Sequence, residues 1–198
     1  QNNLSCNGGS NGIASVAVTG GVAPYTYLWL PNGGSAAMAS GLAAGTYTAT
    51  VTDANSCIAT QNFIISEPAA LITTPESQTN LSCNGGSNGI ASVGVTGGVA
   101  PYTYSWVPTG GTAAMASGLA AGNYTVTVTD VNSCTATQNF TISEPAPLIA
   151  YQAAKTNISC NGASTGSATV AVTGGVGPYT YSWSPTGGTA AMASGLAA

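Results

Sequence analysis

Cysteine is the most reactive residue type in this chain, and its five copies are regularly placed. Cys6, Cys83 and Cys160 recur every 77 residues, and Cys57 and Cys134 each follow the first cysteine of their copy by 51 residues. Two cysteines per small domain at a constant spacing are typical of a disulfide in an oxidising compartment. We therefore expect bonds Cys6–Cys57 and Cys83–Cys134, each inside one copy, with the partner of Cys160 lying 13 residues beyond the end of the sequence.

Two other cysteine chemistries remain open at this stage. Buried free thiols would show the same spacing. Zinc is disfavoured because the chain has no His and no C-x-x-C pair, so two thiolates would leave a tetrahedral site half filled. A disulfide closing a loop of this size would stabilise a domain by about 4 kcal/mol in the chain-entropy model, which is a large share of what so small a core supplies.

A short acidic motif before the second cysteine of each copy is the best candidate metal site. It offers side-chain oxygens at positions i and i+2, from Asp53, Asn55, Asp130 and Asn132. Calcium takes six to eight oxygen ligands, so backbone carbonyls and a glutamate from the domain junction, Glu67 or Glu144, would have to complete the set. The alternative is that Asp and Asn shape the turn. We favour the turn and expect no cofactor, with calcium as the weaker prediction.

Charge excludes several function classes. The chain has one Lys, no Arg and no His, with five acidic residues. Nucleic-acid binding needs basic residues to neutralise phosphates, and the chain has no run of apolar residues long enough to insert into a membrane. General acid–base catalysis favours His or paired carboxylates, and each full copy offers one Asp and one Glu about 14 residues apart. We predict that the chain is not an enzyme.

The elements that position these residues repeat with the same 77-residue period. Trp29, Trp106 and Trp183 mark it, and the first two copies differ at only ten of 63 positions between Cys6 and Pro68. A period of this length indicates tandem copies of an autonomous domain rather than short stacked solenoid units. We predict repeat 1 over residues 1–66, with part of its first strand missing, repeat 2 over 67–143, and repeat 3 over 144–198, truncated before its last two strands.

Within a copy, short segments of alternating apolar and polar residues predict strands separated by Gly, Pro and Asn turns. In repeat 1 they cover Ile13–Thr19, Tyr25–Leu30, Gly45–Asp53 and Cys57–Ser66. Residues 35–41 have some helix propensity, but we favour a short edge strand there. Six or seven short strands with turns every eight to twelve residues predict an all-β, immunoglobulin-like antiparallel β-sandwich per repeat, with a tyrosine corner at residues 41–47 and short, stiff linkers that arrange the repeats as a rod.

Aromatic residues share one face of these strands, whereas the opposite face tolerates serine. Leu28 is replaced by Ser105 and Ser182 in the other copies, which indicates a solvent-exposed side. We therefore expect the aromatic face to pack in the core rather than form a binding shelf. The predicted core residues are Tyr25, Tyr27, Trp29, Tyr47, Tyr102, Tyr104, Trp106, Tyr124, Tyr179, Tyr181 and Trp183.

Several runs together resemble the SprB-type repeat of giant cell-surface and gliding adhesins of Bacteroidota. They are Cys6–Gly12, Gly20–Trp29, Gly41–Tyr47, Val51–Cys57 and the closing Ser66–Pro68. The Pro-Tyr-Thr-Tyr-x-Trp segment also resembles polycystic-kidney-disease domains, although the Asp-rich turn usual after their Trp is missing. The SprB resemblance implies export by the type IX secretion route, display at the cell surface and a role in adhesion or gliding motility. It carries over no catalytic residue.

Three functions remain open from the sequence. The leading one is a structural stalk or surface filament, in which identical modules give length. The second is a carbohydrate-binding adhesin module that uses exposed aromatics or calcium to bind a surface polysaccharide. The third, ice binding, is disfavoured because the threonine rows are only three residues long. Since low charge gives weak repulsion between chains, we also expect lateral or end-to-end association of copies of the repeat.

Overall fold

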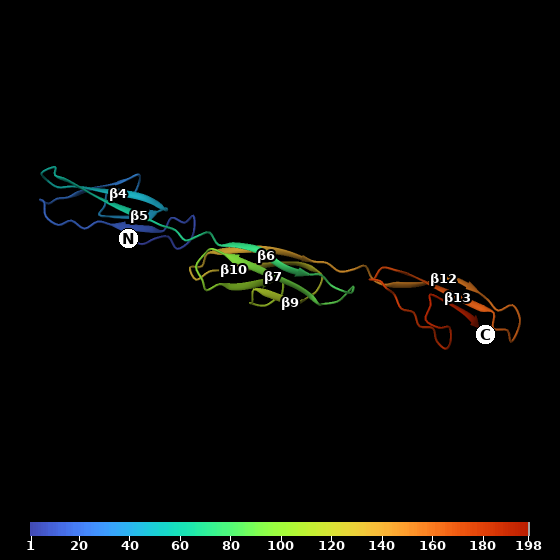
Figure 1. The fold of residues 1–198 in the computed structure, drawn as a ribbon. Helices are drawn as coiled ribbons and strands as arrows, with labels where there is room; N and C mark the ends of the chain where they lie inside the picture. The colour runs from blue at the N-terminus through green and yellow to red at the C-terminus, as the bar shows by residue number, and fades with distance from the viewer. Residues whose placement is uncertain (198) are drawn as a thin grey trace.

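The computed structural model describes residues 1–197, and every regular element in that range is a β-strand. Figure 1 shows three units that follow one another in chain order, with the N-terminus in the first and the C-terminus in the last. The strands of each unit fall within the ranges predicted for repeats 1, 2 and 3. No helix among these residues is long and apolar enough to cross a membrane.

Repeat 2 has the fullest set of strands. They are β6 (Ile72–Thr79), β7 (Gly89–Thr96), β8 (Thr103–Val107), β9 (Met115–Leu119), β10 (Gly122–Thr129) and β11 (Thr135–Ile142). They form two three-stranded antiparallel sheets, β6-β7-β9 and β8-β10-β11. The buried cluster contains residues of both sheets. The predicted all-β sandwich is therefore confirmed, and the expected edge strand is β9 here and β3 in repeat 1.

The alternation of residue types explains how these strands pack. In β10, Tyr124, Val126 and Val128 are buried, whereas the threonines between them are half exposed. Trp106 on β8 lies opposite Val126 and its ring packs against Phe140, with ring centroids 5.4 Å apart. Successive side chains of a strand point to opposite faces, so the period-two pattern places every second residue in the core.

Repeat 1 contains the same fold with one strand fewer. Its strands are β1 (Gly12–Ser15), β2 (Thr26–Leu30), β3 (Met38–Leu42), β4 (Gly45–Thr52) and β5 (Ile58–Ile65). They form the sheets β1-β3 and β2-β4-β5. The strand expected over Ile13–Thr19 is shorter than predicted. Its counterpart β7 runs over eight residues because β6 pairs with one side of it, whereas on the matching side of β1 the Asn2–Ile13 bridge takes the place of that strand.

Repeat 3 contains β12 (Ile149–Thr156), β13 (Gly166–Thr173) and β14 (Met192–Leu196), which form one sheet. Residue 198 lies outside the described residues. The core prediction for Tyr179 is wrong, since 39% of its surface is exposed. In repeat 2 the matching Tyr102 precedes β8, the edge strand of the sheet β8-β10-β11, whereas the segment that follows Tyr179 pairs with no strand among residues 1–197.

Most of the other predicted core aromatics are removed from solvent. Trp29, Trp106, Tyr47 and Tyr124 are buried, and the remaining predicted core residues are half buried, namely Tyr25, Tyr27, Tyr102, Tyr104, Tyr181 and Trp183. The predicted tyrosine corner is present twice. The Tyr47 hydroxyl donates to the Ala43 carbonyl at 3.2 Å, and the Tyr124 hydroxyl donates to the Ala120 carbonyl at 3.1 Å.

Candidate functional site

The candidate functional site is the junction between repeats 1 and 2, where a disulfide and several hydrogen bonds join the two units. A disulfide joins Cys6 to Cys134, with the two Cα atoms 5.7 Å apart and a sequence separation of 128 residues. Neither expected pair, Cys6–Cys57 nor Cys83–Cys134, forms in the structure. Among residues 1–197, Cys57, Cys83 and Cys160 are exposed free thiols.

The within-repeat pairing is wrong because the two cysteines of a repeat lie at opposite ends of the sandwich. Cys57 precedes β5, whose eight residues span about 26 Å at 3.3 Å per residue. Cys6 lies beyond the far end of β5, where the Leu4 N–H donates to the Ser66 carbonyl at 2.9 Å. Disulfide geometry requires Cα atoms within about 7 Å, so no bond inside repeat 1 is possible without unfolding it.

The loop that holds Cys6 is also bound to the linker between the repeats. The Gly8 N–H donates to a carboxylate oxygen of Glu67 at 2.6 Å, and the Asn7 amide donates to the Pro68 carbonyl at 3.1 Å. From the other side of the junction, the Asn132 amide donates to the Ser5 carbonyl at 2.9 Å. A disulfide, a charge-assisted hydrogen bond and two amide hydrogen bonds therefore hold this junction.

The turn that holds Cys134 is shaped by Asp130. One carboxylate oxygen accepts from the backbone N–H groups of Asn132 and Cys134, both at 2.9 Å, and the other accepts from the Val99 N–H at 2.9 Å. Burial by itself raises the pKa of the Asp130 carboxyl, but these three donors outweigh it and hold the pKa below its usual value. They stabilise the charged form of the carboxyl.

Asp53 has the same role in repeat 1. Backbone hydrogen bonds, first from Cys57 and then from Val22, lower its pKa from the usual value. This geometry is the one that the turn-shaping alternative predicts, since the carboxylate oxygens already accept backbone donors. β5 separates Glu67 from Asp53 along the length of repeat 1, whereas Glu67 binds the loop of Cys6 at the junction where Cys6 is bonded to Cys134. Calcium binding by Asp53, Asn55, Asp130 and Asn132 otherwise stays a prediction.

Two glycines make room for the linker at this end of repeat 2. The Gly98 N–H donates to the Ala69 carbonyl at 2.9 Å, and a Cβ on Gly97 would overlap the backbone of Ala70. The matching Gly20 of repeat 1 has nothing within 4 Å of that position. Gly97 is therefore needed both for its positive φ of 68° and for the close passage of the chain.

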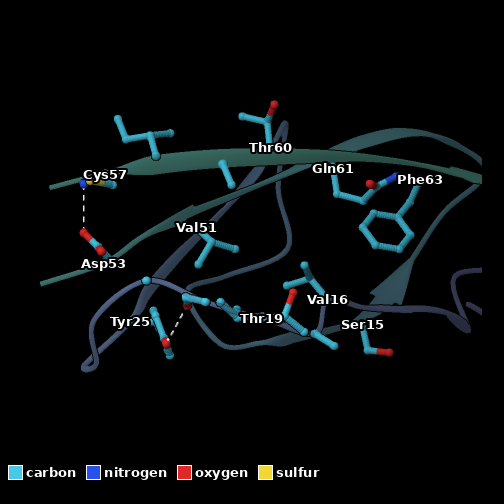
Figure 2. Close-up of a pocket in the computed structure, with 16 residues that line it drawn as sticks. Ser15, Val16, Thr19, Tyr25, Val51, Asp53, Cys57, Thr60, Gln61 and Phe63 are labelled. Carbon is cyan, nitrogen blue, oxygen red and sulfur yellow. Dashed lines mark hydrogen bonds between the residues drawn. The ribbon is translucent and has the colours of Figure 1, made fainter. Parts of the chain in front are cut away.

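Repeat 1 also contains a groove of about 490 Å³ lined by residues of β5 and by residues 15–21. Figure 2 shows Val51 and Phe63 on one side of this groove and Val16 on the other. In repeat 2 the matching space is filled by β6, whose Thr73 hydroxyl and Gln78 amide donate to the Thr137 and Thr141 carbonyls at 3.0 and 2.7 Å.

The burial of matching residues shows that this groove corresponds to the space that β6 occupies in repeat 2. Val93 and Phe140 of repeat 2 are 2% and 3% exposed, whereas their counterparts Val16 and Phe63 are only half buried. Gln1, which corresponds to Gln78, makes the same bond to β5, from its amide to the Ile64 carbonyl at 2.9 Å. We therefore assign this groove to sheet packing and not to a small ligand.

All three repeats share a hydrogen bond that the sequence analysis did not predict. The hydroxyls of Tyr25, Tyr102 and Tyr179 donate to the carbonyls of the glycines five residues earlier, at 2.9, 2.6 and 2.6 Å. The Gly-Gly-Val-x-Pro-Tyr spacing, identical in each copy, was the available signal. These bonds fix the turn that receives the linker.

The fold and the junction define this chain as a tandem β-sandwich repeat protein whose first two units are joined by a disulfide. The SprB repeat family model matches residues 1–34, 76–111 and 153–189. The chain therefore belongs to the SprB repeat family, and the resemblance seen in the sequence is confirmed.

A solved structure of three N-terminal domains of the bacteriophage RB49 Highly Immunogenic Outer Capsid protein (Hoc) is similar, at 18% identity and a TM-score of 0.46, over 87% of this chain and 67% of that one. A search of curated proteins found no match.

Proposed function

We propose that this chain is a non-catalytic structural segment of a bacterial cell-surface adhesin, in which successive repeats form a stalk or filament. Membership of the SprB repeat family supports a surface adhesin. The near identity of repeats 1 and 2 supports a role in which length matters, since catalysis seldom needs identical copies in a row. The proposal includes export by the type IX route and display outside the cell.

The observation that carries this proposal is the Cys6–Cys134 bond. A stalk must transmit position and force from one unit to the next, and inter-domain linkers are by default flexible. Here the linker is held by the Glu67 and Pro68 contacts, and the two units are joined covalently. If the repeats only acted as separate binding modules, a disulfide and several hydrogen bonds between neighbouring units would not be needed.

The aromatic residues favour the stalk over the carbohydrate-binding module. A stacking platform for sugars needs flat, exposed rings, whereas Trp29 and Trp106 are 2% and 5% exposed. The indole N–H of Trp29 donates to the Ala36 carbonyl at 2.8 Å, which fixes the ring in the core. Carbohydrate binding is therefore not the function that we propose.

Lateral association is part of the same proposal. The outer face of the sheet β2-β4-β5 carries four exposed apolar side chains, Leu28, Leu30, Ile58 and Ile64. In repeat 2 the same positions hold Ser105, Val107, Thr135 and Thr141. Exposed apolar residues gathered on one face favour contact with other protein surfaces, and copies of the repeat are the partner that we expect.

The test of the proposal is imaging of cells that produce this protein with an antibody raised against the repeat. We expect label on filaments or on an extended layer at the cell surface. A diffuse soluble pool, with no label on the surface of intact cells, would contradict the stalk.

A further inference from the structure

Repeats 1 and 2 present the same pair of cysteine-bearing loops at their two ends. The turn cysteine, Cys57 or Cys134, follows the Asp turn at the end that receives the preceding linker. The loop cysteine, Cys6 or Cys83, lies at the opposite end beside the departing linker. Each repeat therefore has one cysteine facing the unit before it and one facing the unit after it.

The surroundings of Cys83 repeat those of the bonded Cys6. The Gly85 N–H donates to a carboxylate oxygen of Glu144 at 2.6 Å, the distance found for Gly8 and Glu67. The Asn84 amide donates to the Pro145 carbonyl at 3.1 Å, as Asn7 does to Pro68. The loop of repeat 2 is thus already held in the conformation that presents Cys6 to its partner.

At the second junction, the linker packs on repeat 3 in the same way as the first linker packs on repeat 2. The Gly175 N–H donates to the Ala146 carbonyl at 2.8 Å, which matches the 2.9 Å bond between Gly98 and Ala69. A Cβ on Gly174 would overlap the backbone of Pro147, as one on Gly97 would overlap Ala70. The linker therefore enters repeat 3 over the same glycine pair. The described residues of repeat 3 do not include a counterpart of the hairpin turn that carries Cys57 in repeat 1 and Cys134 in repeat 2.

We infer that the disulfides of this repeat form a staggered series, in which the loop cysteine of each repeat bonds to the turn cysteine of the next. In this series, Cys83 would bond to the turn cysteine of a complete third repeat, and Cys57 would bond to the loop cysteine of a preceding repeat. Every bond in the series crosses a junction and none closes within a repeat. This inference deepens the proposed stalk, because it makes each junction of the array covalent.

Each bond forms by thiol–disulfide exchange with an oxidised dithiol or a low-molecular-weight disulfide. The two cysteine thiols lose two protons and two electrons and form one S–S bond, while the S–S bond of the oxidant breaks to give two thiols. Because Cys57 and Cys83 are exposed, such an oxidant can reach them before the neighbouring repeat docks.

The staggered series also changes which residues bear tension. When the chain is pulled from its ends, force passes from Cys6 through the disulfide to Cys134, so the intervening residues carry none of it. A pair inside one repeat would protect that repeat alone and would leave the linker under load. The staggered arrangement protects the junction itself.

The test extends the full chain by a copy of residues 122–145 placed after Ala198, which restores the hairpin of repeat 3. The copy carries Val131→Leu, at an exposed position, so that its cysteine peptide differs in mass from the native one. After oxidation, thiols are alkylated and the disulfides mapped by mass spectrometry. We expect Cys83 in a crosslink with the marked peptide and Cys6 still bonded to Cys134. In the matched Cys83→Ser chain, the marked cysteine should be alkylated.

A bond from Cys83 to Cys134 or to Cys57 in either extended chain would overturn the inference. Protection of Trp183 from acrylamide quenching reports whether the added hairpin has folded. A second extension by a copy of residues 122–198 places a further unit beyond the hairpin and supports its folding. Cys83 found free in both extended chains rejects the staggered series. Surface imaging tests the stalk separately, so the two proposals can fail independently.

Discussion

Cys6 of repeat 1 is bonded to Cys134 of repeat 2, although Cys57 belongs to the same sandwich as Cys6. Figure 1 shows the first two units meeting end to end at this junction. The bond is placed there by two local devices. Glu67 and Pro68 hold the loop of Cys6 against the linker, and the Asp130 carboxylate closes the turn that presents Cys134.

Loss of Cys134 should destabilise the chain far more than loss of Cys57. Cys134→Ser opens a closed loop of 128 residues, which removes about 4–5 kcal/mol in the chain-entropy model. Cys57→Ser removes only an exposed free thiol and should leave stability unchanged. Guanidinium denaturation of the oxidised proteins measures both. Equal losses in the two variants would argue for one bond within each repeat.

Gly97→Ala should cost more stability than Gly20→Ala. Both glycines have positive φ, 68° and 77°, so the backbone strain of alanine is common to the two variants. Only at Gly97 does the new methyl group overlap the linker backbone, and overpacking costs about 1–3 kcal/mol. The difference between the two midpoints of thermal unfolding measures that clash. If the two variants lose equal stability, the linker does not pack on the glycine pair.

Acid should weaken the junction turns. The pKa values of Asp53 and Asp130 are lower in the folded chain than the usual 3.8. Their contribution to stability is therefore complete above that value and is lost as the pH falls below it. Asp130→Asn should be less stable than the parent at pH 7 and should lose less further stability on acidification. Unfolding curves recorded between pH 7 and pH 2 test this, and parallel pH profiles would contradict it.

The exposed face of repeat 1 should drive self-association. Leu28→Ser with Leu30→Ser introduces the residues that repeat 3 already has at these positions, Ser182 and Ser184. Both leucines are about half exposed, at 51% and 53%, so the change should not unfold the sandwich. Sedimentation velocity over a range of concentrations should show less association for the double variant. Unchanged association would place the contact on another surface.

The sequence predicted the strands well because period-two alternation determines which residues face the core. In Gly45–Thr52 the spacing of Tyr47, Ala49 and Val51 was sufficient to place these side chains inside. The tyrosine corner was predicted for a similar reason, since it is a local contact between a side chain and a carbonyl four residues before it.

The disulfide pairing could not be predicted in the same way. The period shows which cysteines are equivalent, but it is the same whether Cys6 bonds inside its repeat or to the next one. The answer depends on which end of the sandwich each loop occupies. That follows from β5 running the length of the repeat between Cys57 and Glu67. The exposure of Tyr179 was missed because packing in repeat 3 depends on strands that the described residues do not include.

Single-molecule stretching of the 198-residue chain from its two ends tests the covalent junction most directly. The Cys6–Cys134 bond excludes 128 residues from extension, about 45 nm of chain at 3.3–3.6 Å per residue. We predict that reductant adds this length in one step, that Cys57→Ser leaves the step unchanged and that Cys134→Ser removes it. Two separate gains of about 18 nm, one of them lost in Cys57→Ser, would contradict the account.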